Sequence, residues 1–180
     1  MLRSFLLLTT ALLFAGCATQ RAPLPTVAAV DLARYAGRWH EIARLPNFFQ
    51  KAGARATADY TALADGSIKV VNTETRADGT QKSVAGRATA VPGRGQARLR
   101  VKFGGLAALA PAAREGNYWI VALAPDYSVA LVGTPDRKFL WLLARDPQLS
   151  ERTRRGWLAR ARQLGFPVER VLVTQWPGAV

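Results

Sequence analysis

Between residues 35 and 132, hydrophobic and polar positions alternate in short runs that are separated by turn residues. A period of two is typical of strands that bury one face. Asp-Gly pairs at 65–66 and 78–79 favour tight hairpins between successive runs. Together with an apolar run further on, the pattern predicts eight strands, at residues 37–44, 54–63, 67–76, 81–90, 96–103, 117–123, 128–132 and 139–145.

The periodicity changes after residue 145. Asp146-Pro147 ends the last strand, and residues 148–164 then repeat with helical spacing, with Ser150 or Asp146 as the N-cap and Gly165 with Pro167 at the end. A final short strand is predicted at 170–175. The apolar face of the helix consists of Leu149, Thr153, Trp157, Ala161 and Leu164. Arg residues occupy the other side, so we expect a helix packed outside the strands with a solvated basic face.

Eight strands in simple hairpin order define an all-β fold. They can close into an up-and-down antiparallel barrel whose interior holds one small ligand, with the single C-terminal α-helix packed outside. A two-sheet sandwich of the same strands is the alternative, and the regular hairpin order argues against it. The predicted domain covers residues 30–180.

The N-terminus has the pattern of an export signal. Arg3 precedes an apolar stretch at 5–14 that is too short to span a bilayer, which predicts a signal peptide over residues 1–16. The small residues Ala15-Gly16 before Cys17 resemble the lipobox of bacterial lipoproteins, although Phe14 stands where that pattern usually has Leu. An ordinary secretory signal with a chance cysteine is the alternative. In the lipoprotein interpretation Cys17 is the acylated mature N-terminus.

Residues 17–29 contain Pro23 and Pro25 among mostly small side chains and predict a flexible, extended tether. Ala18 after Cys17 resembles the sorting signal of Gram-negative outer-membrane lipoproteins. We therefore expect a protein that is lipid-anchored in the outer membrane, with its domain facing the periplasm.

Three motifs stand in order along the predicted barrel. The first strand begins with Gly37-x-Trp39, the turn between strands six and seven carries Asp126-Tyr127, and Arg145 ends strand eight. Together they resemble the lipocalin signature, and the chain is similar to bacterial lipoprotein lipocalins, with plant temperature-induced lipocalins and apolipoprotein D as relatives. The resemblance implies that Arg145 lies across the Trp39 ring at the closed end of the barrel, a structural cation–π contact. Asp126 is expected to accept backbone hydrogen bonds nearby.

Charge and composition limit the classes of binding partner that the sequence predicts. Lys and Arg total 25 against 12 Asp and Glu among 180 residues, a net charge of +13 that favours acidic partners such as anionic headgroups. The Arg residues are spread along an exported chain, so no nucleic-acid partner is expected. One cysteine excludes an intrachain disulfide, and one histidine without a Cys/His cluster argues against a transition-metal site. We expect no metal and no cofactor.

The ligand is expected toward the open end, opposite the signature residues. Alternation from Arg145 points Leu143, Trp141 and Phe139 inward, while parity does not decide between Tyr118 and Trp119. The predicted ligand-binding residues are Phe48, Phe49, Tyr118, Trp119, Phe139, Trp141 and Leu143. Basic residues near this rim would suit an anionic headgroup: Arg44, Lys51, Arg55, Lys102 and Arg114. The apolar loop at 104–116 is either a lid or a membrane contact.

These features favour a membrane-anchored carrier of fatty acids, lysophospholipids or similar amphiphiles. A lipid-modifying enzyme is not expected, because Cys17 serves the anchor, His40 alternates away from the pocket, and no interior pair of carboxylates is evident. A structural lipoprotein without cargo remains the main alternative, because a sequence does not measure cavity volume. The sequence also leaves the oligomeric state open, a homodimer included.

Overall fold

The computed structural model describes residues 22–104 and 114–178. Its strands are β1 (Gly37–Arg44), β2 (Arg55–Ala62), β3 (Ile68–Thr75), β4 (Gln81–Ala90), β5 (Arg98–Phe103), β6 (Tyr118–Leu123), β7 (Val129–Gly133), β8 (Leu140–Ala144) and β9 (Leu172–Val173). The helices are α1 (Leu32–Tyr35), α2 (Glu151–Gln163) and a 3₁₀ turn, η2 (Val168–Arg170).

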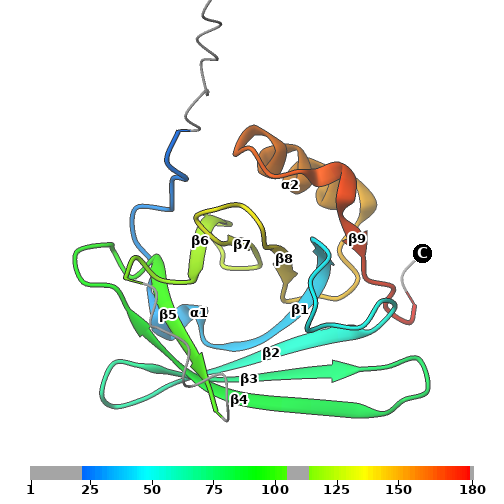
Figure 1. The fold of residues 1–180 in the computed structure, drawn as a ribbon, viewed down its shortest axis with the longest axis horizontal. Helices are drawn as coiled ribbons and strands as arrows, with labels where there is room; N and C mark the ends of the chain where they lie inside the picture. Colours follow the sequence, from blue (N-terminus) through cyan, green and yellow to red (C-terminus); the bar gives the residue numbers. More distant parts are fainter. Residues whose placement is uncertain (1–21, 105–113, 179–180) are drawn as a thin grey trace, which may run out of the picture.

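The strands form one antiparallel sheet that closes on itself. Each of β2 to β7 pairs with the next strand in the chain, and β1 closes the ring because its first half pairs with β2 and its second half with β8 (Figure 1). The predicted eight-stranded up-and-down barrel is therefore confirmed. The predicted ninth strand is only two residues long, and it pairs with the end of β1 at Ala43 and Arg44.

The helix α2 lies outside the ring of strands (Figure 1). Its N-cap is Ser150, whose hydroxyl accepts a hydrogen bond from the Thr153 amide at 3.2 Å. Ala161 is its one buried residue, and it packs with Leu140 and Leu142 on the outer face of β8. Gly165 ends the helix with a φ of +86°, a backbone conformation that glycine adopts without a Cβ penalty.

The segment before α1 differs from the expected tether. Leu24 is 2% exposed and packs into the apolar layer outside the barrel, and the Val27 amide donates to the Ile120 carbonyl at 3.1 Å. Residues 22–29 are thus part of the folded domain rather than a flexible linker. Two prolines among small residues indicate extended backbone, but they do not show whether that backbone is packed.

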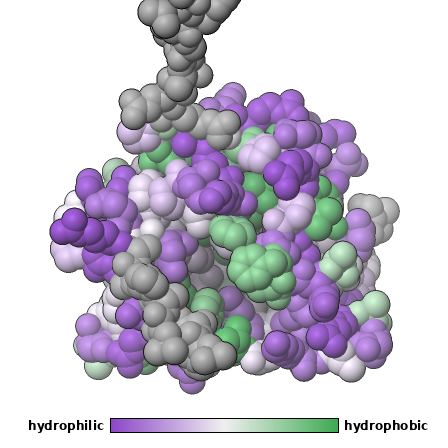
Figure 2. Space-filling view, in the orientation of Figure 1, coloured by the Kyte–Doolittle hydropathy of each residue, from purple (hydrophilic) through white to green (hydrophobic). Residues whose placement is uncertain are grey.

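Several sequence predictions fall outside the described residues. Cys17, the signal peptide at 1–16 and positions 105–113 of the apolar loop are among them. Within the described ranges, no helix is both long enough and apolar enough to cross a membrane. Hydrophilic residues dominate the face drawn in Figure 2, with apolar residues grouped in small patches.

Candidate functional site

Two apolar clusters line the two faces of the sheet. Adjacent residues of β8 belong to different clusters. Leu143 belongs to the interior cluster with Trp39, whereas Leu142 belongs to the outer cluster with Ala161 of α2. Trp141 packs against the interior cluster. Leu143 and Trp141 therefore point into the barrel, as alternation predicts, while their role in ligand binding stays a prediction.

A stacked pair seals the closed end of the barrel. The Arg145 guanidinium lies 4.0 Å from the centre of the Trp39 ring, so the expected contact is present, and Trp39 is fully buried. The indole N–H of Trp39 donates to the Tyr35 carbonyl at 2.9 Å. Arg145 donates to five backbone carbonyls, those of Arg34, Tyr35, Ala36, Arg38 and Tyr127, at 2.8–3.3 Å.

Gly37 and the Asp126-Tyr127 turn complete this end. Gly37 has a φ of +97°, and a Cβ at this position would lie 3.1 Å from Nη1 of Arg145. Asp126 accepts hydrogen bonds from the amide and hydroxyl of Ser128, which hold the pKa of its carboxyl below the ordinary value. The Tyr127 hydroxyl accepts from the Asp31 amide at 3.0 Å, so the turn is tied to the start of α1.

Three tyrosines meet inside the barrel just above this plug. The Tyr118 hydroxyl lies 2.7 Å from that of Tyr35 and 3.0 Å from that of Tyr60. Burial raises the pKa of Tyr60 to about 12 and that of Tyr118 well above its ordinary value, so all three carry their protons. Three O–H groups share two hydrogen bonds, and among the described residues the third proton has no acceptor. The floor of the barrel is therefore polar but uncharged.

The structure decides between the two aromatic residues at the start of β6. Tyr118 pairs with Leu99, an interior residue, whereas Trp119 pairs with Arg98 on the outer face. Trp119 packs into the outer cluster under the Arg98 guanidinium, which lies 3.7 Å from its ring centre. The prediction that Trp119 contacts an interior ligand is thus wrong, because this position points out of the barrel.

At the open end, four aromatic rings form a path from solvent into the barrel. Phe48 is 91% exposed and Phe49 54% exposed, and their ring centres are 5.1 Å apart. Phe49 contacts Phe139 at 5.7 Å and Trp141 at 6.3 Å, and these two rings stack on each other. The path thus joins an exposed phenyl ring to the interior face of β8.

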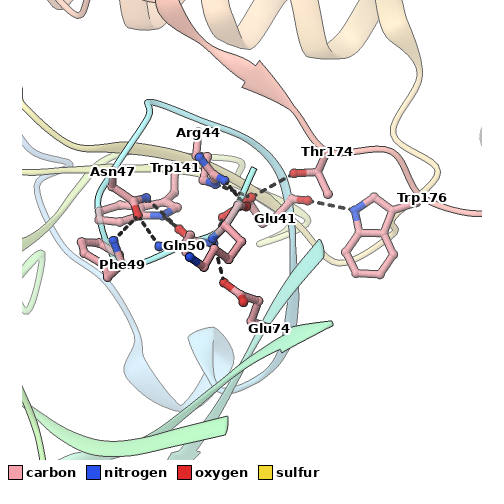
Figure 3. Close-up of polar contacts among 10 residues, drawn as sticks. Glu41, Arg44, Asn47, Phe49, Gln50, Glu74, Trp141, Thr174 and Trp176 are labelled. Carbon is pink, nitrogen blue, oxygen red and sulfur yellow. Dashed lines mark hydrogen bonds and ion pairs between the residues drawn. The ribbon is translucent and has the colours of Figure 1, made fainter. Parts of the chain in front are cut away.

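A polar network lies beside this path (Figure 3). The Glu41 carboxylate is 3.2 Å from the Arg44 guanidinium, with both side chains 3% exposed. The carboxylate also accepts hydrogen bonds from the Gln50 amide at 2.7 Å and the Thr174 hydroxyl at 2.9 Å. The amide oxygen of Gln50 accepts from the indole N–H of Trp141 at 3.2 Å. Gln50 therefore connects the loop after β1 to both the buried ion pair and the aromatic path.

The ion pair also binds neighbouring segments. Arg44 donates to the Lys51 carbonyl at 2.9 Å, and the indole of Trp176 donates to the Glu41 carbonyl at 2.8 Å. Burial raises the pKa of the Glu41 carboxyl, because loss of solvation outweighs its contacts with Gln50, Arg44 and Thr174. Opposite charges in a dry site hold each other in place, which fixes the loop at the mouth.

The predicted basic rim is only partly present. Lys51, Lys102 and Arg114 are exposed. Arg55 is half-buried, with its guanidinium 5.8 Å from the centre of the Trp176 ring. Arg44 is not at the rim but inside, neutralised by Glu41. The register shifts between Glu41 and Ala43, and this bulge turns Arg44 to the same side of the strand as Glu41.

A closed barrel with one sealed end and one aromatic mouth defines a class of proteins that enclose small apolar ligands. The Lipocalin-like domain family model matches residues 30–175, so the chain belongs to the lipocalin-like family. Members of this family are in general binding proteins that take small hydrophobic ligands.

Similar sequences and solved structures support the assignment to the lipocalin-like family. Temperature-induced lipocalin-1 of Arabidopsis thaliana is 36% identical over 155 residues, covering 85% of this chain and 83% of the relative. Outer membrane lipoprotein Blc of Escherichia coli is 33% identical over 174 residues, covering 95% and 94%. Among solved structures, insecticyanin of the tobacco hornworm has a similar fold, with a TM-score of 0.65 at 22% identity over 87% of this chain and 86% of that one.

Sequence reasoning missed the buried pair and its connector. Glu41 and Arg44 are three positions apart, which on a regular strand places them on opposite faces, and only the bulge brings them together. Gln50 lies in a loop where no periodicity applies. Glu41 was the available signal, because it is a charged residue with the same parity as the inward-facing Trp39.

Proposed function

We propose that this protein is a lipid-anchored carrier that holds a single-chain amphiphile, a fatty acid or a lysophospholipid, inside the barrel. It captures, stores or transports this cargo in the cell envelope. The observation that carries the proposal is the aromatic path from the exposed Phe48 through Phe49 to Trp141. An acyl chain laid along such rings leaves water, at a gain of about 25 cal/mol per Å² of apolar surface buried.

The location belongs to the same proposal. Cys17 carries the acyl anchor, and the domain faces the periplasm from the outer membrane. The support is the lipobox-like sequence at 15–17 and the similarity to a relative whose name is Outer membrane lipoprotein. One acyl chain binds a membrane marginally and two bind it stably. Mass spectrometry of the membrane fraction tests the acylation of Cys17 directly.

The proposed ligand contacts are Phe48, Phe49, Phe139, Trp141, Leu143 and Tyr118. The polar floor of tyrosine hydroxyls suits a neutral acceptor group, whereas a charged headgroup is better placed at the mouth. There the exposed Lys51 and Lys138 are available. An amphiphile therefore lies with its chain inside and its headgroup outside.

Binding is tested with the chain from Ala18 onward, because the described contacts begin at Ala22. A fluorescent fatty acid reports binding, with palmitate and lysophosphatidylcholine as competitors. We expect Trp141→Phe to weaken binding about tenfold, which corresponds to about 1.4 kcal/mol of lost contact. Trp157→Phe, a matched change on α2 outside the barrel, leaves the affinity unchanged.

Two outcomes contradict the proposal. If Trp141→Phe binds like the parent protein, the ligand does not follow the aromatic path. If the parent protein binds no lipid while its circular dichroism shows a folded barrel, the structural role without cargo is correct. Mass spectrometry of lipids that copurify with the parent protein identifies the cargo class.

A further inference from the structure

The N-terminal segment follows the barrel from its closed end to its open end. The Val30 amide donates to the Gly95 carbonyl, in the turn between β4 and β5 at the closed end. Val27 bonds to β6 at Ile120, and Leu24 is buried against the outer layer. Read toward the N-terminus, the segment therefore runs from the closed end toward the open end, and it passes from the interior cluster at Val30 and Val27 to the outer layer at Leu24.

A buried arginine holds the upper end of this segment at the mouth. Arg137 lies in the turn between β7 and β8, an open-end turn because β7 runs away from the closed end. Its guanidinium donates to the Ala22 carbonyl at 2.8 Å and to the Leu164 carbonyl, at the end of α2, at 2.7 Å. Arg137 is only 9% exposed. The chain thus leaves the folded domain at the same end as the aromatic path.

Arg137, which holds the chain at Ala22, and the exposed ring of Phe48 line the same groove. A groove of about 770 Å³ is lined by Phe48 and Arg137, together with Lys138, Phe139, Phe166 and Arg170. Asp136 and Glu169 also line it, so acidic side chains offset most of the basic ones. Exposed phenyl rings, rather than net charge, distinguish this surface, and such rings are favoured at membrane interfaces.

We propose that the mouth of the barrel faces the bilayer, with Phe48 and Phe49 inserted among the lipid headgroups. The inference rests on the proposed acylation of Cys17. Four residues, 18–21, lie between Ala22 and the anchored Cys17, and the five extended steps from Cys17 to Ala22 span at most about 18 Å. Cargo then passes between the membrane and the aromatic path without crossing water.

The opposite orientation does not fit the chain length. The eight residues of β1 rise about 26 Å along the strand, or about 20 Å along the barrel axis at a tilt of about 40°. To present the closed end, the chain before Ala22 would have to run back past the whole barrel. The four residues between Cys17 and Ala22 are too few for that path.

Site-specific fluorescence tests the orientation on the full acylated chain in vesicles of phosphatidylcholine and phosphatidylglycerol. One label is attached at Lys138→Cys on the mouth and a matched label at Ala64→Cys in the turn between β2 and β3 at the closed end. Both residues are exposed, and acylation removes Cys17 as a competing thiol. We expect lipid-borne nitroxide to quench the label at 138 and aqueous iodide to quench the label at 64.

Two variants sharpen the result. Phe48→Ser removes the inserting ring, and we expect it to lower the lipid quenching of the label at 138 about threefold. Arg137→Gln releases the Ala22 carbonyl and lets the domain rotate, so lipid quenching of that label also falls. Arg152→Gln, on the exposed face of α2, removes the same charge and leaves the quenching unchanged.

The outcomes separate this inference from the proposed function. If the protein does not float with the vesicles, the anchor fails and the orientation fails with it. If the protein floats but iodide quenches both labels equally, or lipid quenches the label at 64, only the orientation is wrong. Protection of the label at 138 from both quenchers means that a second copy covers the mouth, which also overturns the inference.

Discussion

The two ends of the barrel satisfy their polar groups in different ways. At the closed end, Arg145 reaches five backbone carbonyls and stacks on a fully buried Trp39. At the open end, the fixed polar contacts converge on one buried ion pair, Glu41 and Arg44, while Phe48 and Phe49 stay exposed. At the closed end the hydrogen-bond acceptors are backbone carbonyls, which are present whatever the residue type. At the open end the contacts depend on particular side chains, including one from a loop.

This difference separates stability from binding. Hydrogen bonds from one side chain to several carbonyls fix backbone segments that are far apart in sequence, so their loss lowers the stability of the barrel. An exposed aromatic loop contributes little to folding and keeps its apolar surface for a partner. We therefore expect substitutions at the closed end to change stability and substitutions at the mouth to change binding.

Trp39→Ala should produce the largest effect. Removing a fully buried indole leaves a cavity beneath Arg145, and we expect a loss of about 3–5 kcal/mol in the free energy of unfolding. Urea denaturation measures it. Phe48→Ala, the same type of truncation at a 91% exposed ring, should change stability by less than about 0.5 kcal/mol. Comparable losses in both variants would remove the distinction between the two ends.

Arg145→Lys comes next. Lysine keeps the charge but lacks the planar guanidinium with its several N–H donors, so most of the five carbonyls lose their donor. We expect about 2–3 kcal/mol of destabilisation by urea denaturation, with the fold retained by circular dichroism. Arg55→Lys, at a half-buried guanidinium over Trp176, is the control and should have a much smaller effect.

The closed end was also the more predictable of the two. Gly37, Trp39 and Arg145 could be assigned roles because their motifs resemble the lipocalin signature, which implies a plug at the closed end with a cation over it. The barrel itself followed from alternation and from Asp-Gly turns. At these positions the local pattern and the tertiary structure require the same residues.

The open end was less predictable because it depends on irregular backbone. The bulge after Glu41 shifts the parity of β1, and alternation alone assigns Arg44 to the wrong face. Tyr118 and Trp119 are adjacent and both aromatic, so only the pairing with Leu99 shows which one points inward. The packing of Leu24 depends on a surface that the barrel provides only after folding.

Tyr118→Phe tests the polar floor between the two ends. The change removes the hydroxyl that bridges Tyr35 and Tyr60, and both of those lose a partner in a dry site. We expect a loss of about 1–2 kcal/mol in the free energy of unfolding. Tyr60→Phe removes a terminal hydroxyl and one hydrogen bond, so its cost should be smaller. Equal costs would contradict the central position of Tyr118.

The smallest expected effect is a difference in pH dependence between the two ends. Burial raises the pKa of Glu41 above its ordinary 4.5, so the folded protein binds this proton more tightly than the unfolded chain does. The stability from this group is fully present below pH 4.5 and falls as the pH rises through the raised pKa. Arg44 and Glu74 are the charged groups that act on it.

Asp126 at the closed end provides a matched control of opposite sign. The hydrogen bonds from Ser128 lower the pKa of its carboxyl below 3.8, so its contribution is present above that value and is lost as the pH falls. Urea denaturation of Glu41→Gln and Asp126→Asn from pH 3 to pH 7 measures both. The stability of Glu41→Gln should fall less than that of the parent protein as the pH rises, and that of Asp126→Asn should fall less as the pH drops. If Glu41→Gln leaves the fall of stability above pH 4.5 unchanged, the Arg44 charge rather than burial controls the pKa of this carboxyl. The ion pair at the mouth is then as firm as the hydrogen bonds of the closed end.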